Sequence, residues 1–203
     1  MKTVNFNGKK VTPSKVICIG RNYVDHITEL SNEIPDEMVV FLKPNSAISD
    51  ELYAFHEESL HYEAELCFLY QKGEFSAVAL GLDLTKRNLQ ATLKAKGLPW
   101  ERAKAFNGAA IFSEFVQLDT IDNNLSLTLE IDNTLTQVGG VALMMYKPDV
   151  ILSQLSSFMT LEEGDIVMTG TPKGVGEVIA GSTFVGKVKQ GEKTLVSASW
   201  LAI

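Results

Sequence analysis

Two glutamates, Glu63 and Glu65, lie in the segment SLHYEAELCFLY, which otherwise has the pattern of a strand bound for the protein interior. On a strand both side chains point to one face, with their Cα atoms roughly 6.6 Å apart. Carboxylates held this close repel each other and raise a pKa unless a cation lies between them. Asp83 ends a second apolar segment, AVALGLDL, and would add a third carboxylate. The pattern is consistent with a Mg²⁺ or Mn²⁺ site, because these ions take oxygen ligands, or with a solvated strand face.

A second pair of residues has the spacing of a general base. His26 and Glu29 are three residues apart in a segment of helical pattern, so one face would carry both side chains. A histidine oriented by a carboxylate can take a proton from water, although a polar surface pair fits the same spacing. His61 shares the predicted acidic face and could support the metal ligands, whereas His56 is expected in a loop.

Three cations could hold an anionic ligand. Lys104, Arg21 and Arg87 are each able to bind a carboxylate or an oxyanion, although any one of them alone would more often be a surface charge. The glycine-rich segment TGTPKGVG has neither the order nor the spacing of a phosphate-binding loop. It is therefore interpreted as a turn whose backbone packs closely against another part of the protein.

The elements that must position these residues are short. In the first half, KVICIG is a predicted buried strand, Val24, Ile27 and Leu30 recur as on a short helix, and MVVFLKPNSAI is a strand that Pro44 stops. The Glu63 segment is predicted to have one apolar face and one acidic face. Thr85 is predicted to cap the helix KRNLQATLKAK, which contacts the core through Leu89 and Leu93 and which Gly97 and Pro99 close.

The second half of the chain adds a hairpin, a helix and a loop. SLTLEIDNTLTQ alternates and turns at Asp132 and Asn133, which predicts a hairpin. KPDVILSQLSSFMTL predicts a helix, and GDIVMTGTPKGVG predicts a strand that runs into the glycine-rich loop. Strands outnumber helices, so the predicted fold is a β-rich α+β domain. The core stripe predicted for the helix consists of Ile151, Leu152, Leu155, Phe158 and Met159.

Composition limits the class of protein. A chain of 203 residues, 45% hydrophobic and 21% charged, can bury a full core and is expected to form one domain, 1–203. Its net charge of -7 and the lack of a basic stripe argue against a nucleic-acid partner. No leader pattern or apolar span of about 20 residues occurs, so a soluble cytoplasmic protein without membrane contact is expected. Cys18 and Cys67 are expected to be buried thiols.

Taken together and in order, several motifs resemble the fumarylacetoacetate hydrolase family. The resemblance is closest to its short single-domain members, which include acylpyruvate hydrolases, oxaloacetate decarboxylases and tautomerases, and ring-fission product isomerases. It runs from about residue 15 to the C-terminus, and it implies packed mixed sheets with a few short helices. The motifs are GRNYVDHITEL, FLKPNSAI, HYEAEL, LGLDLTKRNLQ, KGLPWERAKAFNG and MTLEEGDIVMTGTPKGVG.

The resemblance also implies roles for individual residues. Mg²⁺ or Mn²⁺ would be bound by Glu63, Glu65 and Asp83, and His26 with Glu29 would be a water-activating dyad on a lid. Asn88 departs from the aspartate common after the arginine, and the family pattern implies a homodimer. Lys104 matches the family's lysine after the helix, and the substrate-side positions match Arg21, Tyr23, Arg87, Gln90 and Thr171.

The expected activity is hydrolysis of the carbon–carbon bond of 3-acylpyruvates through a metal-bound enolate. The alternatives at the same site are an oxaloacetate tautomerase or decarboxylase, or an isomerase of the 2-hydroxyhepta-2,4-diene-1,7-dioate type. A protein that binds a metal and a dicarboxylate without turnover is a third, less favoured possibility. The partner in all cases is a small 2-oxo acid.

Overall fold

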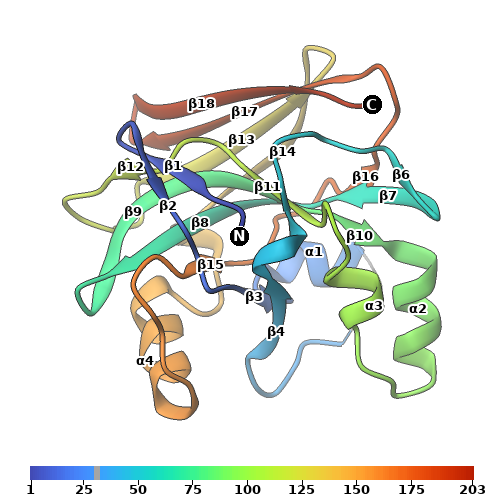
Figure 1. Cartoon of the computed structure of the whole chain (residues 1–203), viewed down its shortest axis with the longest axis horizontal. Helices are drawn as coiled ribbons and strands as arrows, with labels where there is room; N and C mark the ends of the chain where they lie inside the picture. Colours follow the sequence, from blue (N-terminus) through green and yellow to red (C-terminus); the bar gives the residue numbers. More distant parts are fainter. Residues whose placement is uncertain (30–32) are drawn as a thin grey trace.

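The computed structural model describes residues 1–29 and 33–203, and strands dominate it (Figure 1). The strands are β1 (Val4–Phe6), β2 (Lys9–Val11), β3 (Lys15–Gly20), β4 (Val39–Pro44), β5 (Ile48–Ser49), β6 (Phe55–His56), β7 (Glu58–Tyr62), β8 (Ala64–Gln71), β9 (Glu74–Asp83), β10 (Thr85–Lys86), β11 (Ala110–Phe112), β12 (Val116–Gln117), β13 (Leu125–Ile131), β14 (Thr134–Gly140), β15 (Ile166–Met168), β16 (Gly176–Glu177), β17 (Thr183–Gln190) and β18 (Lys193–Leu201). The helices are α1 (Val24–Glu29), α2 (Arg87–Ala95), α3 (Glu101–Lys104) and α4 (Pro148–Phe158), with 3-10 turns η1 (Asn45–Ala47) and η2 (Val141–Leu143). The predicted β-rich α+β fold is confirmed.

The largest sheet is mixed and has the order β4-β3-β15-β8-β9-β11-β5, with β12 paired to β9. Strand β15 lies parallel to β3 and antiparallel to β8, so segments far apart in the chain become neighbours at its centre. A second, antiparallel sheet has the order β14-β13-β17-β18 and lies along the top of Figure 1. Helices α2, α3 and α4 lie on the opposite side of the large sheet.

The core fills the space between the two sheets. Leu66, Phe68 and Leu80 of the large sheet belong to one buried cluster with Leu127 and Phe184 of the second sheet. The sheets approach so closely at Gly186 that a Cβ there would overlap the Leu80 side chain. This close contact is what encloses the middle of β8 and β9, the strands that carry the acids.

Strand β8 corrects one expectation from the sequence. The alternation predicted a strand with one apolar and one acidic face, yet Glu65 and Cys67 are as fully buried as Leu66 and Phe68. Both faces of a central strand are covered when a second layer packs on each side, so neither face needs to be polar. The acids therefore sit in the interior, where their charge must be compensated.

The predicted hairpin is confirmed at β13 and β14. Asp132 and Asn133 both have positive φ angles, 48° and 65°, as a type I′ turn requires. The strands that this turn joins pair in register except for one irregularity, after Leu129, where Leu129 opposes Gln137 and Glu130 opposes Leu135. Thr136 is thus an extra residue in β14, a β-bulge.

Other local expectations have mixed outcomes. The closure of α2 at Gly97 is confirmed by a positive φ of 62°, but Thr85 does not cap that helix. Along α4, Ile151 and Leu155 are buried whereas Phe158 is 61% exposed, because the helix ends there and its last turn leaves the core. Of the other predicted core positions, Leu93 is buried, while Leu89, Leu152 and Met159 are half-buried.

Three further points concern membranes, cysteines and one core position. No helix in the described part of the chain is long and apolar enough to cross a membrane. Cys18 and Cys67 are free and buried, as expected. Leu30, predicted on the first helix, lies outside the described residues.

Asp165 joins the start of β15 to the start of β3. Its carboxylate accepts hydrogen bonds from the Ser14 hydroxyl (2.7 Å), the Glu162 N–H (2.9 Å) and the Ser14 N–H (3.1 Å), and it pairs with the Lys15 ammonium. Burial would raise the pKa of Asp165, but the Lys15, Glu162 and Ser14 donors outweigh it and lower that pKa.

Asp165→Asn is expected to lower the free energy of unfolding at pH 7 by about 2 kcal/mol, since hydrogen bonds to a charged group are lost. The folded-state pKa lies below the unfolded value of about 3.9, so the wild-type advantage is complete above that value and disappears as the pH falls through the folded pKa. Urea unfolding at pH 7 and pH 3 measures both effects, with the exposed Asp119→Asn as the control. A variant equal to the wild type at pH 7 would contradict the assignment.

Candidate metal centre and active site

Three buried carboxylates meet where their strands end or break. Glu63 lies between β7 and β8, Glu65 is the second residue of β8, and Asp83 is the last of β9. The Asp83 N–H donates to the Glu63 carbonyl oxygen (2.8 Å), which holds the strand ends together. One carboxylate oxygen from each residue lies within 4.8 Å of the others. The three residues thus form one oxygen-rich cluster, as the sequence predicted.

Two buried ammonium groups accompany the acids. Lys104, the last residue of α3, donates to Thr85 Oγ1 (2.6 Å), Asp83 Oδ2 (2.8 Å) and Glu63 Oε2 (2.9 Å). The Thr85 hydroxyl therefore accepts a hydrogen bond from Lys104 instead of capping α2. Lys43 of β4 is fully buried, and its Nζ lies 2.7 Å from Asp83 Oδ1. Sequence reasoning missed Lys43, whose only signal was a lysine inside the apolar segment MVVFLKP.

The pKa values of Glu63 and Glu65 are shifted in opposite directions. Burial would raise the pKa of Glu63, but Lys104 and Arg87 hold it well below its ordinary value. Burial raises the pKa of Glu65 well above its ordinary value, and the charges of Asp83 and Glu63 raise it further. Burial would lower the pKa of Lys104, yet the Asp83 and Glu63 carboxylates outweigh burial and raise it. The ionised form of Glu65 is thus stabilised less than that of Glu63 by the protein groups around it.

The donor set fits a hard divalent cation. All three groups are carboxylates, and Mg²⁺ and Mn²⁺ prefer oxygen ligands. Glu65 Oε2 accepts a hydrogen bond from the Gly170 N–H (2.7 Å), which orients the carboxylate toward the cluster. A cation among the three acids would relieve the repulsion that raises the pKa of Glu65. The residues present could therefore hold Mg²⁺ or Mn²⁺ without rearrangement of their strands.

The cavity above the cluster is small, about 40 Å³, which is little more than the volume of one water molecule. It is lined by the acids and Lys104, together with Ile19, Gly20, Arg21, His26, Ile27, Phe41, Arg87, Gln90, Lys94, Trp100, Gly170 and Thr171. Nine predicted site residues are therefore brought together. This volume suits an ion with a water molecule.

The predicted dyad lies over this cavity on α1. His26 is buried, and its Nδ1 is 3.3 Å from Glu29 Oε2. The Gly174 N–H donates to both carboxylate oxygens of Glu29, at 3.0 and 3.2 Å. The carboxylate thus holds the imidazole and ties α1 to the glycine-rich loop, which makes the pair more than a surface contact. Because Nδ1 faces Glu29, Nε2 is the ring nitrogen left to exchange a proton.

Arg21 is held in a strained turn. Its φ is 56°, a left-handed conformation that few residues other than glycine adopt, and such strain often accompanies a site. The next residue, Asn22, fixes the turn: its Nδ2 donates to the Thr169 (2.9 Å) and Tyr146 (3.0 Å) carbonyls. The Tyr146 N–H donates back to Asn22 Oδ1 (2.6 Å). The fold therefore supports a conformation that places Arg21 at the cavity.

Arg87 is oriented by two neighbours. Its guanidinium donates to Gln90 Oε1 (2.9 Å) and pairs with the Glu63 carboxylate. Asn88, at the position where the resemblance implies aspartate, is exposed, and no described hydrogen bond joins its side chain to Arg87. The structure therefore gives the orienting role to Gln90 and Glu63, and the departure at Asn88 leaves Arg87 in place.

Tyr23, expected on the substrate side, and His61, expected beside the metal ligands, are not among the described residues that line the small cavity. Tyr23 is buried but lines an adjoining hollow with Pro172 and Lys173, and burial, then the Glu65 charge, raises its pKa. His61 lies on β7, which pairs with β10 and β16 in a separate small sheet, and there it opposes Thr85 and Glu177; among the described residues it neither lines the cavity nor bonds the acids. The suggested support of the metal ligands by His61 is therefore wrong.

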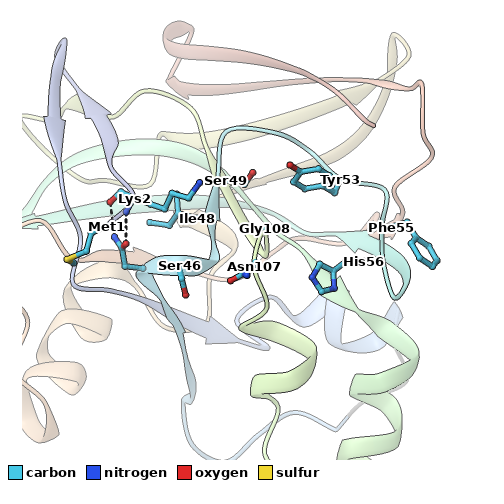
Figure 2. A pocket seen from close by; sticks show the side chains of 11 residues that line it. Met1, Lys2, Ser46, Ile48, Ser49, Tyr53, Phe55, His56, Asn107 and Gly108 are labelled. Atoms are coloured by element: carbon cyan, nitrogen blue, oxygen red, sulfur yellow. Dashed lines mark hydrogen bonds between the residues drawn. The ribbon is translucent and has the colours of Figure 1, made fainter.

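A larger open hollow, about 820 Å³, is not this site. It lies near the N-terminus, and Figure 2 shows Met1, Lys2, Tyr53, Phe55 and His56 around it. Among the described residues no carboxylate lines it, and His56, which does, packs against the ring of Phe106. We place the chemistry in the smaller cavity because that cavity contains the converging charged groups.

Comparison with known proteins is consistent with this geometry. The family model for the fumarylacetoacetate (FAA) hydrolase C-terminal domain matches residues 15–199. A Bos taurus protein named oxaloacetate tautomerase FAHD1, mitochondrial, is 41% identical over 180 residues, which are 80% of this chain and 81% of that protein. A crystal structure from Oleispira antarctica matches with a TM-score of 0.93 and 32% identity over 100% of both chains.

A second crystal structure concerns the metal. It is fumarylpyruvate hydrolase from Pseudomonas aeruginosa in complex with Mn²⁺ and pyruvate, and it matches with a TM-score of 0.89 and 27% identity. The match covers 100% of this chain and 95% of that chain.

Proposed function

Because the chain belongs to the fumarylacetoacetate hydrolase family, we propose that it is a divalent-metal-dependent enzyme that tautomerises oxaloacetate between its enol and keto forms. The name of the Bos taurus relative supports this choice of reaction. The observation that carries the choice of substrate is the set of cations beside the acidic cluster. Arg21, Arg87 and Lys94 line the same small cavity, and three cations suit a dicarboxylate better than a monoacid.

The cations lie close enough to influence one another. Burial, then the charges of Arg21 and Arg87, lowers the pKa of Lys94. A bound dicarboxylate would place negative charge beside these three cations. Oxaloacetate has one carboxylate on its keto carbon and a second one on the adjacent methylene carbon, so it can meet the metal cluster and the cations together.

Glu63, Glu65 and Asp83 would hold the ion. When bound, Mg²⁺ or Mn²⁺ would polarise the keto group of a 2-oxo acid and acidify the protons on the adjacent carbon. Arg87, already aligned by Gln90, donates to a ligand carboxylate. His26 Nε2 exchanges the proton at that carbon, and Glu29 on Nδ1 stabilises the imidazolium that forms.

A panel of substrates tests the proposal. Purified protein with Mn²⁺ is given enol oxaloacetate, acetylpyruvate and fumarylpyruvate, and enol decay, pyruvate release and acylpyruvate cleavage are recorded separately. Fastest turnover in the enol assay, lost on chelation, is the expected result. Cleavage of acylpyruvates with no acceleration of enol decay would reject the tautomerase proposal.

Acylpyruvate hydrolysis is the second candidate function. The intact His26–Glu29 pair favours it, because that arrangement can activate water. The name of the Pseudomonas aeruginosa hydrolase supports it too. An isomerase of the 2-hydroxyhepta-2,4-diene-1,7-dioate type would use the same groups without water.

His26→Ala is expected to slow oxaloacetate tautomerisation by about 100-fold or more, because the proton-exchanging nitrogen is lost. Mn²⁺ affinity, measured by calorimetry, should stay at the wild-type value, since the metal ligands are untouched. His56→Ala, outside the cavity, is the matched control. If His26→Ala tautomerises oxaloacetate at the wild-type rate but no longer cleaves acylpyruvates, His26 acts in hydrolysis and not in tautomerisation.

The remaining expectations concern assembly and place of action. We propose that residues 1–203 work as one catalytic domain in a cytoplasmic homodimer, without a nucleic-acid or membrane partner. The net charge of -7 supports the lack of a nucleic-acid partner. Light scattering after size exclusion tests the dimer, and a single thermal transition with or without Mn²⁺ tests the single domain.

A further inference from the structure

Gln137 is a buried polar residue that none of the proposed steps uses. It lies on β14, in the second sheet, and is 1% exposed. Its Oε1 accepts the Ala64 N–H (3.0 Å), and its Nε2 donates to Thr171 Oγ1 (2.9 Å) and to the Pro172 carbonyl (2.8 Å). One side chain therefore connects the second sheet, the acid-bearing strand and the glycine-rich loop.

The Ala64 contact is important because Ala64 separates the two glutamates of the acidic cluster. The N–H of Ala64 belongs to the peptide that follows Glu63, and its carbonyl belongs to the peptide that precedes Glu65. Gln137 binds the first of these groups, and the Thr171 hydroxyl donates to the second (2.9 Å). These two hydrogen bonds fix both peptide planes, so they set the directions in which the two carboxylates project.

The bulge in β14 brings this strand against the glycine-rich loop. Thr136, the extra residue, presents its carbonyl oxygen to Gly174, where a Cβ would overlap it. A Cβ at Gly139 would lie 2.7 Å from Pro172 Cγ, so the strand and the loop are in direct contact there too. Strand β14 therefore packs directly against the glycine-rich loop and supports its conformation.

The same loop reaches both halves of the site. At one end the Gly170 N–H donates to Glu65 Oε2 (2.7 Å), and at the other end the Gly174 N–H donates to the Glu29 carboxylate (3.0 Å). A shift of the loop relative to β8 would move the metal ligand and the dyad apart. Gln137, a side chain of the second sheet, adds a further link between the loop and β8.

We propose that Gln137 is a positioning residue, which aligns Glu63 and Glu65 for the metal and keeps the loop that holds Glu29 in register with them. It touches neither the ligand nor the ion, and acts through Ala64 and Thr171. The inference rests on the proposed function in requiring a metal at the acidic cluster. Loss of such supporting contacts in metal sites typically costs 10–100-fold in affinity or activity.

The main test compares Gln137→Met with Gln190→Met. Methionine has nearly the volume of glutamine but cannot form the three hydrogen bonds, and Gln190, half-buried on β17 and bonded to Asp122 (2.7 Å), provides the same change away from the site. Mn²⁺ affinity is measured by calorimetry, and the spectrum of bound Mn²⁺ by electron paramagnetic resonance. We expect about tenfold or greater loss of affinity and an altered spectrum in Gln137→Met alone.

Thermal unfolding distinguishes positioning from folding. If Gln137→Met is folded in chelator and binds Mn²⁺ within twofold of the wild type, with an unchanged spectrum, the inference is overturned. If Gln137→Met does not fold, Mn²⁺ binding is measured in Thr171→Val, which removes the hydroxyl donor to the Ala64 carbonyl while leaving Gln137 in place. Weakened Mn²⁺ binding in that variant supports the inference, and wild-type binding overturns it. If the wild type itself binds no Mn²⁺, the proposed function fails, which is a separate result.

Discussion

Glu65→Gln is expected to abolish Mn²⁺ binding and catalysis while leaving the metal-free protein folded. Glutamine keeps an oxygen that can accept the Gly170 N–H, so the local hydrogen bond is preserved. It removes, however, one of three negative charges from the acidic cluster. Since loss of a mere supporting contact costs 10–100-fold in metal affinity, loss of a ligand is expected to exceed this.

Thermal unfolding gives a readout that does not depend on the substrate. In the wild type, Mn²⁺ at about 100 times its dissociation constant should add about 2.7 kcal/mol, which raises Tm by roughly 5–10 °C. Glu65→Gln should show no such rise, and its Tm in chelator should equal or exceed that of the wild type because a repelled buried carboxylate is gone. Glu74→Gln, an exposed change on β9, is the control. An equal Mn²⁺-induced rise in the Tm of Glu65→Gln would contradict the assignment of the metal centre to this acidic cluster.

Lys104→Met is expected to be the most destabilising of the substitutions considered. The Lys104 ammonium is buried between Glu63 and Asp83, and its removal leaves two carboxylates in the interior without that partner. Breaking a buried ion pair in this way costs about 3–5 kcal/mol. The variant should also lose activity, because Lys104 lines the cavity.

Metal distinguishes a charge effect from a packing effect in this variant. If the ammonium serves to balance the acids, Mn²⁺ should restore part of the lost stability of Lys104→Met, since a cation again lies among the carboxylates. Lys96→Met, at an exposed position after α2, should change Tm little with or without Mn²⁺. A Lys104→Met protein with the wild-type Tm in chelator would contradict the proposed balance of charges.

Much of the local structure could be predicted from the sequence. Alternation in the 125–131 segment and the Asp132–Asn133 pair located the hairpin, because a type I′ turn needs residues that tolerate positive φ. The three acids were also noted, because two carboxylates on one face of a strand repel each other unless a cation lies between them, and the family resemblance implied the metal site. These signals depend on neighbours in the chain or on a chemical conflict at a single position.

The roles of Thr85 and Phe158 could not be predicted in the same way. Thr85 has the residue type and the place of a helix cap, yet its hydroxyl accepts a hydrogen bond from Lys104, 19 residues away. Phe158 has helical spacing, yet it lies where the helix leaves the core. In both cases a tertiary contact, or the lack of one, outweighed a correct local pattern.

What the sequence determined by itself is the kind of elements and the chemical identity of the cluster that binds the proposed metal, because periodicity and residue type are local properties. What only the tertiary structure decided is how the charges are compensated. Lys43 approaches Asp83 from the edge strand β4, and Gln137 approaches Ala64 from another sheet. The burial that makes these partners necessary is the sum of contacts from segments distant in the chain, so no single segment contains the information.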